Sequence, residues 1–171
     1  MVEKFFCKVR DSSSSSTTDF FFISCDSKIY FIDTSGLDEK ELILKNMEKI
    51  MKFRNAFQRI NTFIYCQNLD DNRFSQSAKI LFNLMNELYP DSYLFKNLII
   101  VRTKSDRRYI DFEENKKASV YLIKSIKEEY KIDEQIEIKQ YYIDSKYQDK
   151  ESIIEKEKIF DLISKKGFKF N

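Results

Sequence analysis

Histidine is absent from the 171-residue sequence, and glycine is almost absent, with Gly36 and Gly167 as its only examples. Without histidine the chain has no Ser-His-Asp triad, no histidine acid or base, and no histidine-containing zinc site. A phosphate loop of the G-x-x-x-x-G-K-[ST] type needs two glycines separated by four residues, because bare backbone must curl around phosphate. The two glycines here are much farther apart, so the sequence contains no such loop.

Cysteine, excess charge and long apolar runs are also scarce. Cys7, Cys25 and Cys66 are widely spaced in apolar neighbourhoods, as expected for buried, reduced thiols. The 30 basic and 28 acidic residues nearly cancel, which gives no reason to expect nucleic acid or an anionic membrane as partner. No apolar run approaches the ~18 residues of a membrane span, and nothing resembles a signal peptide. We therefore expect a soluble, cytoplasmic protein without a transmembrane segment.

The residues that are present are those of one folded domain over residues 1–171. Hydrophobic residues make up 42% and aromatic residues 15% of the chain, enough for a real core. Predicted strands alternate with predicted helices, which indicates an α/β fold with a mostly parallel sheet. The expected order is a hairpin at 20–25 and 28–33, then helix 39–54, strand 60–66, helix 74–88, strand 97–101, helix 111–129, strand 136–143 and helix 149–165.

Polar clusters follow three of these strands, at 33–36, 103–106 and 144–145. Ligands of open α/β sheets bind at the carboxyl ends of the strands, so these clusters are the candidate site. In the first cluster, Asp33 can hold Mg²⁺ through water, and the backbone N–H of Gly36 can meet a terminal phosphate.

The second cluster, Thr103-Lys104-Ser105-Asp106, matches the [NT]-K-x-D pattern that reads guanine. The Asp106 carboxylate would accept hydrogen bonds from guanine N1–H and the 2-amino group. Adenine lacks both donors, a mismatch that can discriminate by ~10⁴-fold. The stem of Lys104 can lie along the base, and the backbone amide of Ser145 can meet the guanine oxygen.

Each motif alone is also compatible with an ordinary surface turn after a strand, in a globular fold without any ligand. D-x-x-G and T-K-x-D are short patterns in a chain rich in Lys and Asp. Their order and spacing, with a hairpin first and a strand and helix between them, favour descent from a GTPase.

In these motifs the chain resembles the AIG-type GTPases, also called GIMAP or immunity-associated nucleotide-binding proteins, which are relatives of the septins and chloroplast import GTPases. The D-T-P-G motif of the family is similar to residues 33–36, where Ser35 replaces proline. Its T-K-x-D motif matches 103–106, and its intervening strand and long helix resemble 60–90. The resemblance extends over 4–165.

The beginning of the chain also resembles this family. Residues 4–18, KFFCKVRDSSSSSTT, are similar to the phenylalanine-then-serine stretch that leads to the switch threonine. The resemblance implies a mobile, switch-like loop at 11–18, with Thr17 or Thr18 as that threonine. It further implies that this threonine and Asp33 help to hold the Mg²⁺ of GTP or GDP indirectly.

By the same resemblance, the first strand, phosphate loop and first helix of the family would precede Lys4. We therefore expect a three-layer G domain of the P-loop NTPase-like class that lacks those three parts. The missing strand would lie between the strands that end at Asp33 and Cys66. Its loss leaves either a gap in the sheet or two strands that pair directly with each other. We expect the gap, because the predicted flanking helices are long enough to cover a wider sheet. The lost phosphate contacts sum to more than about 6 kcal/mol, or over four decades of affinity.

These observations leave three hypotheses of different classes. The first is an AIG-type domain that binds guanine nucleotide weakly or not at all, for which hydrolysis ranks low because γ-phosphate must be held in line with water. The second is a nucleotide-free pseudo-GTPase that docks on an intact family member, since the resemblance implies homo- or hetero-oligomers through the G domain. The third is a globular fold with no ligand.

Overall fold

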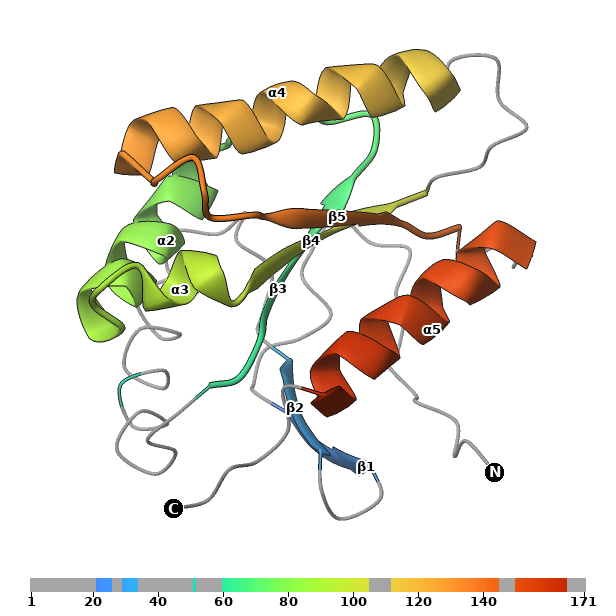
Figure 1. The fold of residues 1–171 in the computed structure, drawn as a ribbon, viewed down its shortest axis with the longest axis horizontal. Coiled ribbons are helices and arrows are strands. Elements are labelled where there is room, and N and C mark those ends of the chain that lie inside the picture. The colour runs from blue at the N-terminus through green and yellow to red at the C-terminus, as the bar shows by residue number, and fades with distance from the viewer. Residues whose placement is uncertain are drawn as a thin grey trace.

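The computed structural model describes residues 21–25, 29–33, 51, 60–104, 112–144 and 150–165. These residues form an α/β arrangement in which strands alternate with helices (Figure 1). The α/β class expected from the sequence is therefore confirmed. The elements are β1 (Phe21–Cys25), β2 (Ile29–Asp33), β3 (Phe63–Asn68), α2 (Gln76–Leu88), α3 (Tyr93–Lys96), β4 (Leu98–Thr103), α4 (Phe112–Tyr130), β5 (Lys139–Tyr142) and α5 (Lys150–Lys165).

The main sheet has three parallel strands in the order β3-β4-β5. Phe63 is opposite Leu98 where β3 and β4 begin to pair, and Arg102 is opposite Tyr142 where β4 and β5 stop. All three strands therefore point their carboxyl ends toward the same edge. The connections through α2 and α4 are the crossovers that parallel strands require.

The predicted hairpin is also present, as a separate antiparallel sheet of β1 and β2. Its register pairs Phe21 with Asp33 and Cys25 with Ile29. No backbone ladder joins this hairpin to the main sheet among the described strands. Of the predicted helix 39–54, only Met51 lies within the described residues, and it is helical.

Helix α2 shows how local sequence builds the first layer. Ser75 is its N-cap, in extended conformation, and its side-chain oxygen accepts a hydrogen bond from the Ala78 N–H at 3.1 Å. From there Ala78, Phe82 and Met85 recur at helical spacing and are buried. The helix ends just before Pro90, which restricts the residue in front of it.

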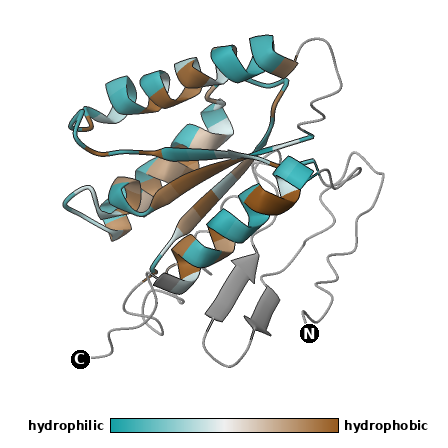
Figure 2. Cartoon of the chain, turned by 45° about the vertical axis from the view of Figure 1, so that its right-hand side comes forward, coloured by the Kyte–Doolittle hydropathy of each residue, from teal (hydrophilic) through white to brown (hydrophobic). Residues whose placement is uncertain are grey.

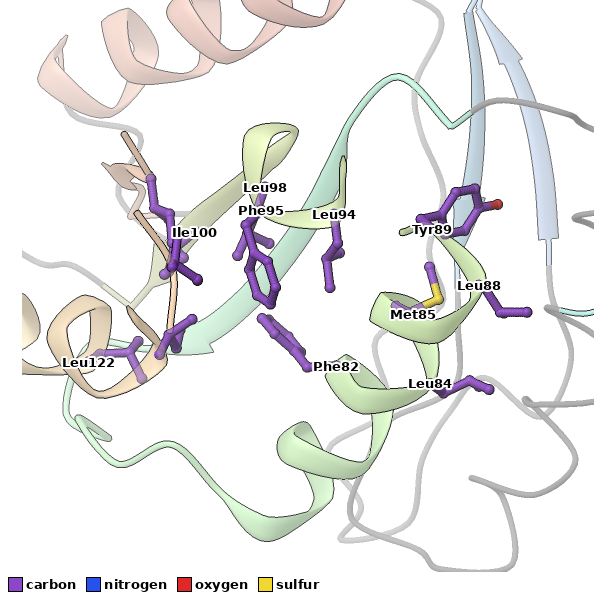
Figure 3. Close-up of a cluster of buried hydrophobic side chains, with 13 residues drawn as sticks. Phe82, Leu84, Met85, Leu88, Tyr89, Leu94, Phe95, Leu98, Ile100 and Leu122 are labelled. Carbon is purple, nitrogen blue, oxygen red and sulfur yellow. The ribbon is translucent and has the colours of Figure 1, made fainter. Parts of the chain in front are cut away.

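One large hydrophobic cluster lies between α2, α3, α4 and one face of the sheet (Figure 3). Phe82 is at its centre, with ring centroids 5.4 Å from Tyr65, 6.3 Å from Phe95 and 6.2 Å from Tyr130. Leu98 and Ile100 of β4 point into this cluster.

The alternate residues of β4, Ile99 and Val101, belong to a second cluster with Tyr141 of β5 and Ile159 of α5. Side chains alternate between the two faces of a strand, so helices cover β4 on both faces. Figure 2 shows the hydrophobic colour concentrated along the central strand and alternating with hydrophilic residues along α4 and α5.

Strand β3 departs from the expectation of a strand covered on both faces. Phe63 and Tyr65 pack against the large cluster, but Ile64 is 38% exposed and Cys66 is exposed. The prediction of a buried Cys66 is therefore wrong. Ile64 and Cys66 belong to neither hydrophobic cluster of the described residues, whereas Ile99 and Val101 of β4 pack with Ile159 of α5.

The described helices include none that is both long enough and apolar enough to span a bilayer.

Candidate functional site

The carboxyl edge of the main sheet gathers the ends of all three parallel strands. The Leu69 N–H, just after β3, donates to the Thr103 carbonyl at 3.0 Å. The Ile143 N–H, just after β5, donates to the Arg102 carbonyl at 2.9 Å. The chain segments that leave β3, β4 and β5 are thus fixed to one another by backbone hydrogen bonds, with β4 in the middle.

Lys104 is the first residue after β4, and its backbone is left-handed, with φ of 54°. An L-residue with a Cβ pays about 1–2 kcal/mol for this conformation. Lys104 is exposed, while its neighbour Thr103 is half-buried and receives the Leu69 hydrogen bond. The strand ending therefore turns sharply at the lysine of the T-K-x-D motif, the kind of local strain that often marks a functional position.

Asp144 follows β5 at the same edge and is only 2% exposed. Its backbone N–H donates to the Ser152 hydroxyl at 2.8 Å, and Ser152 is fully buried. This bond fixes the segment after β5 to the first turn of α5. The residue that the sequence predicts to contact guanine, Ser145, comes next in the chain but lies outside the described residues.

The structure therefore brings together part of the predicted site. Thr103, Lys104 and Asp144 lie at neighbouring strand ends. Asp33 is the last residue of β2, in the other sheet, and the described strands contain no pairing that fixes it to this edge. The remaining predicted residues lie outside the described part of the chain: Asp106 and Ser145 of the guanine site, Gly36 of the phosphate site, and Thr17 and Thr18 of the Mg²⁺ site.

Sequence reasoning missed the most connected side chain of this edge, Arg102. Its guanidinium is fully buried between β4 and the 69–73 loop. Nη1 donates to Gln67 Oε1 at 2.6 Å. Nη2 lies within 2.9 Å of the Leu69 carbonyl and 2.8 Å of both the Asp71 carbonyl and Asn72 Oδ1. The only sequence signal was a charged residue near the end of the otherwise apolar run LIIVRT.

Burial lowers the pKa of Arg102 below its usual range, because desolvation penalises the charged guanidinium. The nearby Tyr142, Tyr65, Asp71 and Asp70 oppose this effect and raise the pKa. Arginine titrates so far above neutrality that the group stays charged at physiological pH. A buried cation is therefore present at this edge, satisfied by oxygen acceptors from the loop after β3.

Two more hydrogen bonds extend this network from the loop. Gln67 Nε2 donates to the Arg73 carbonyl at 2.8 Å, so Gln67 both accepts from Arg102 and holds the far end of the loop. Asn115 Nδ2 of α4 donates to Asp70 Oδ1 at 3.2 Å. The 69–73 loop is thereby fixed to β3, to the end of β4 and to the first turns of α4.

The described residues contain no group of three or more Cys, Asp or Glu side chains arranged to hold a metal ion. The predicted Mg²⁺ site combines Asp33 at the end of β2 with Thr17 and Thr18, and both threonines lie outside the described ranges. What the described edge offers chemically is an exposed cation on Lys104, backbone groups at strand ends, and a neighbouring loop held by side-chain hydrogen bonds.

Comparisons with protein-family models, with curated proteins and with solved structures found no match to this chain.

Proposed function

We propose that this chain is a guanine-nucleotide-binding domain of the AIG type whose affinity is weak because its sequence contains no phosphate loop. Support comes first from the sequence, in which D-T-S-G, an intervening strand and helix, and T-K-S-D occur in the order of that family. The α/β class and the parallel β3-β4-β5 sheet are compatible with a P-loop-like layout.

The observation that carries the proposal is the pairing of β4 with β5. The two strands are parallel and end in register, and neighbouring strands lie about 4.8 Å apart. The segment that starts at Lys104 after β4 and the segment around Asp144 after β5 are therefore adjacent at one edge of the sheet. A guanine base read by the carboxylate of Asp106 and the backbone of Ser145 needs these two loops side by side.

Lost phosphate contacts set the expected strength of binding. Without backbone amides and a lysine around the phosphates, more than about 6 kcal/mol of interaction is missing. A micromolar site would become millimolar, so we expect no Kd tighter than about 100 μM for GTP or GDP with Mg²⁺. Hydrolysis is not part of the proposal, because it requires γ-phosphate held in line with water.

The test is a titration of the ¹⁵N-labelled full chain with GDP and Mg²⁺, with ADP as the competing nucleotide. We expect GDP at millimolar concentration to shift the amide signals of Lys104 and Asp144, and ADP to leave them in place. Lys104→Ala should weaken the response, whereas Lys131→Ala, which changes another exposed lysine with positive φ, should not. Equal shifts with ADP, or none with GDP at about 10 mM, would refute guanine recognition.

A second candidate is a nucleotide-free pseudo-GTPase that docks on an intact relative. The observation that favours it is apolar exposure on α5: Ile153 and Phe160 are seven residues apart on one side of the helix and are 45% and 44% exposed. Sedimentation of the chain mixed with an intact AIG-type GTPase tests this function. Phe160→Asp should reduce association and Val120→Asp, an exposed change on α4, should not. Two independent species in the unmodified mixture would exclude docking on that relative.

A further inference from the structure

The 69–73 loop contacts the chain on both sides of the segment that contains the T-K-x-D motif. At the start of that segment, the carbonyl of Thr103, the first residue of the motif, accepts from the Leu69 N–H. After it, Asn115 of α4 donates to the Asp70 carboxylate. The loop is therefore hydrogen-bonded to both described ends of the connection between β4 and α4, and its position affects where these ends lie.

Arg102 holds this loop from inside the protein. Its guanidinium has an acceptor at Gln67 at the end of β3, and three more at Leu69, Asp71 and Asn72. Hydrogen bonds from a charged donor are about twice as strong as those between neutral groups. Three of the four acceptors belong to the loop, so loss of the guanidinium would release the loop in particular.

We propose that Arg102 is a positioning residue: it clamps the 69–73 loop against the end of β4 and thereby fixes Lys104 for recognition of the base. The inference rests on the proposed function, because it assigns Arg102 a role in that same guanine site. It extends that function by naming a residue outside the T-K-x-D motif that holds the start of the motif in place, on which the selectivity proposed for Asp106 depends. Arg102 itself is fully buried, so its role is to position other residues.

A purely structural arginine would behave differently from a positioning one. Loss of general stability would raise amide exchange everywhere and would weaken GDP and ADP binding alike. Loss of the clamp should raise exchange first in the loop, and should remove the preference for GDP while the rest of the fold is retained. The two readouts together separate the alternatives.

The experiment compares Arg102→Met with Arg73→Met in the full chain. The two changes are chemically identical, but the Arg73 side chain is 94% exposed in the same loop. We expect Arg102→Met to speed amide exchange of Leu69 and Asp71 at least 10-fold relative to the amides of α4, and Arg73→Met to leave it within 2-fold. If Arg102→Met does not fold, Asn72→Ala removes one loop acceptor and should give at least a 3-fold effect.

The same variants are then titrated with GDP and ADP, followed at the Lys104 amide. Arg102→Met should bring the GDP-to-ADP affinity ratio at least 10-fold closer to one, and Arg73→Met should preserve it. Unchanged exchange at Leu69 and Asp71, or an unchanged ratio, overturns the inference. If unmodified protein gives no GDP response, the proposed nucleotide function fails by itself, and the exchange measurement alone then decides whether Arg102 clamps the loop.

Discussion

Lys131 gives a sharp test of how backbone conformation limits the stability of this fold. It follows α4 directly and has φ of 49°, in the left-handed region. The Ile132 N–H donates to the Lys127 carbonyl at 2.9 Å, and the Lys131 N–H to the Glu128 carbonyl at 3.4 Å. This pair of bonds is a Schellman C-cap, in which Ile132 is buried next to the end of the helix. Glycine is the preferred residue at the position that Lys131 occupies.

We expect Lys131→Gly to stabilise the protein by about 0.5–1 kcal/mol. The left-handed conformation costs an L-residue about 1–2 kcal/mol, and glycine removes this cost. Glycine also has a larger conformational entropy in the unfolded state, which destabilises the folded variant by about 0.5–1 kcal/mol. For a chain of this length the change corresponds to a rise in Tm of about 1–4 °C. Thermal unfolding followed by circular dichroism measures it.

Two control variants make the result interpretable. Lys131→Ala removes the side chain but keeps the Cβ, so it should leave Tm nearly unchanged. Lys117→Gly places glycine at an exposed, regular helical position of α4 and should cost about 1 kcal/mol. If Lys131→Gly lowered Tm as Lys117→Gly does, the C-cap reasoning would be refuted.

Three further predictions concern the site, the core and the response to pH. Lys104→Gly should raise Tm as Lys131→Gly does but abolish the GDP response of the Asp144 amide, and a retained response would remove Lys104 from the site. Phe82→Ala should lower the free energy of unfolding in urea by about 3–5 kcal/mol, because the ring is buried among four other aromatic rings. Burial, aided by Glu129, raises the pKa of Tyr130 to about 12 from 10.0, so its stabilising effect is complete below pH 10 and is lost as pH rises towards 12. In urea unfolding at pH 9–12, the free energy of unfolding of Tyr130→Phe should fall less steeply with pH than that of the unmodified protein. An equal slope in the two proteins would show that Tyr130 does not cause the loss of stability.

Much of the main sheet was predictable because its strands have strong local patterns. The predicted strands 60–66 and 97–101 became Phe63–Asn68 and Leu98–Thr103, and helix 74–88 became Gln76–Leu88. Apolar runs and helical periodicity are local signals, so their positions depend little on the rest of the fold. Errors of two or three residues remain at the ends, where side-chain caps and ladder bonds decide the boundary.

Two elements differed for reasons that are visible in the hydrogen bonds. The predicted strand 136–143 shortened to Lys139–Tyr142, because the Ile136 N–H donates to the Asp133 carbonyl at 2.9 Å in a turn. The short helix Tyr93–Lys96 was not predicted, since one turn of helix has no periodic pattern. It follows Ser92, whose φ of 58° is rarely foreseen for a residue other than glycine.

The candidate site was predictable only in part, because its organisation is not local. The T-K-x-D pattern directed attention to Thr103 and Lys104, and the structure places them at a sheet edge beside Asp144. The sequence near Arg102 does not indicate that its acceptors lie 30 to 35 residues earlier in the chain, at Gln67 and in the 69–73 loop. Long-range hydrogen bonds of this kind follow from the fold and cannot be read from the motif.

The exposed side of β3 links these observations to the two arrangements that the resemblance allowed. Direct pairing of the strands ending at Asp33 and Cys66 would have joined the hairpin to the main sheet. The described strands have no such ladder: β2 pairs with β1, and β3 pairs with β4. At the same time Ile64 and Cys66 remain exposed on the side of β3 opposite the large cluster. A parallel strand is normally covered by helices on both faces, and its sequence is then a nearly continuous apolar run. The first four residues of β3, in the sequence FIYCQN, form such a run, but only one face of the strand is well covered. The apolar sequence of β3 and its cover therefore differ on the face that carries Ile64 and Cys66.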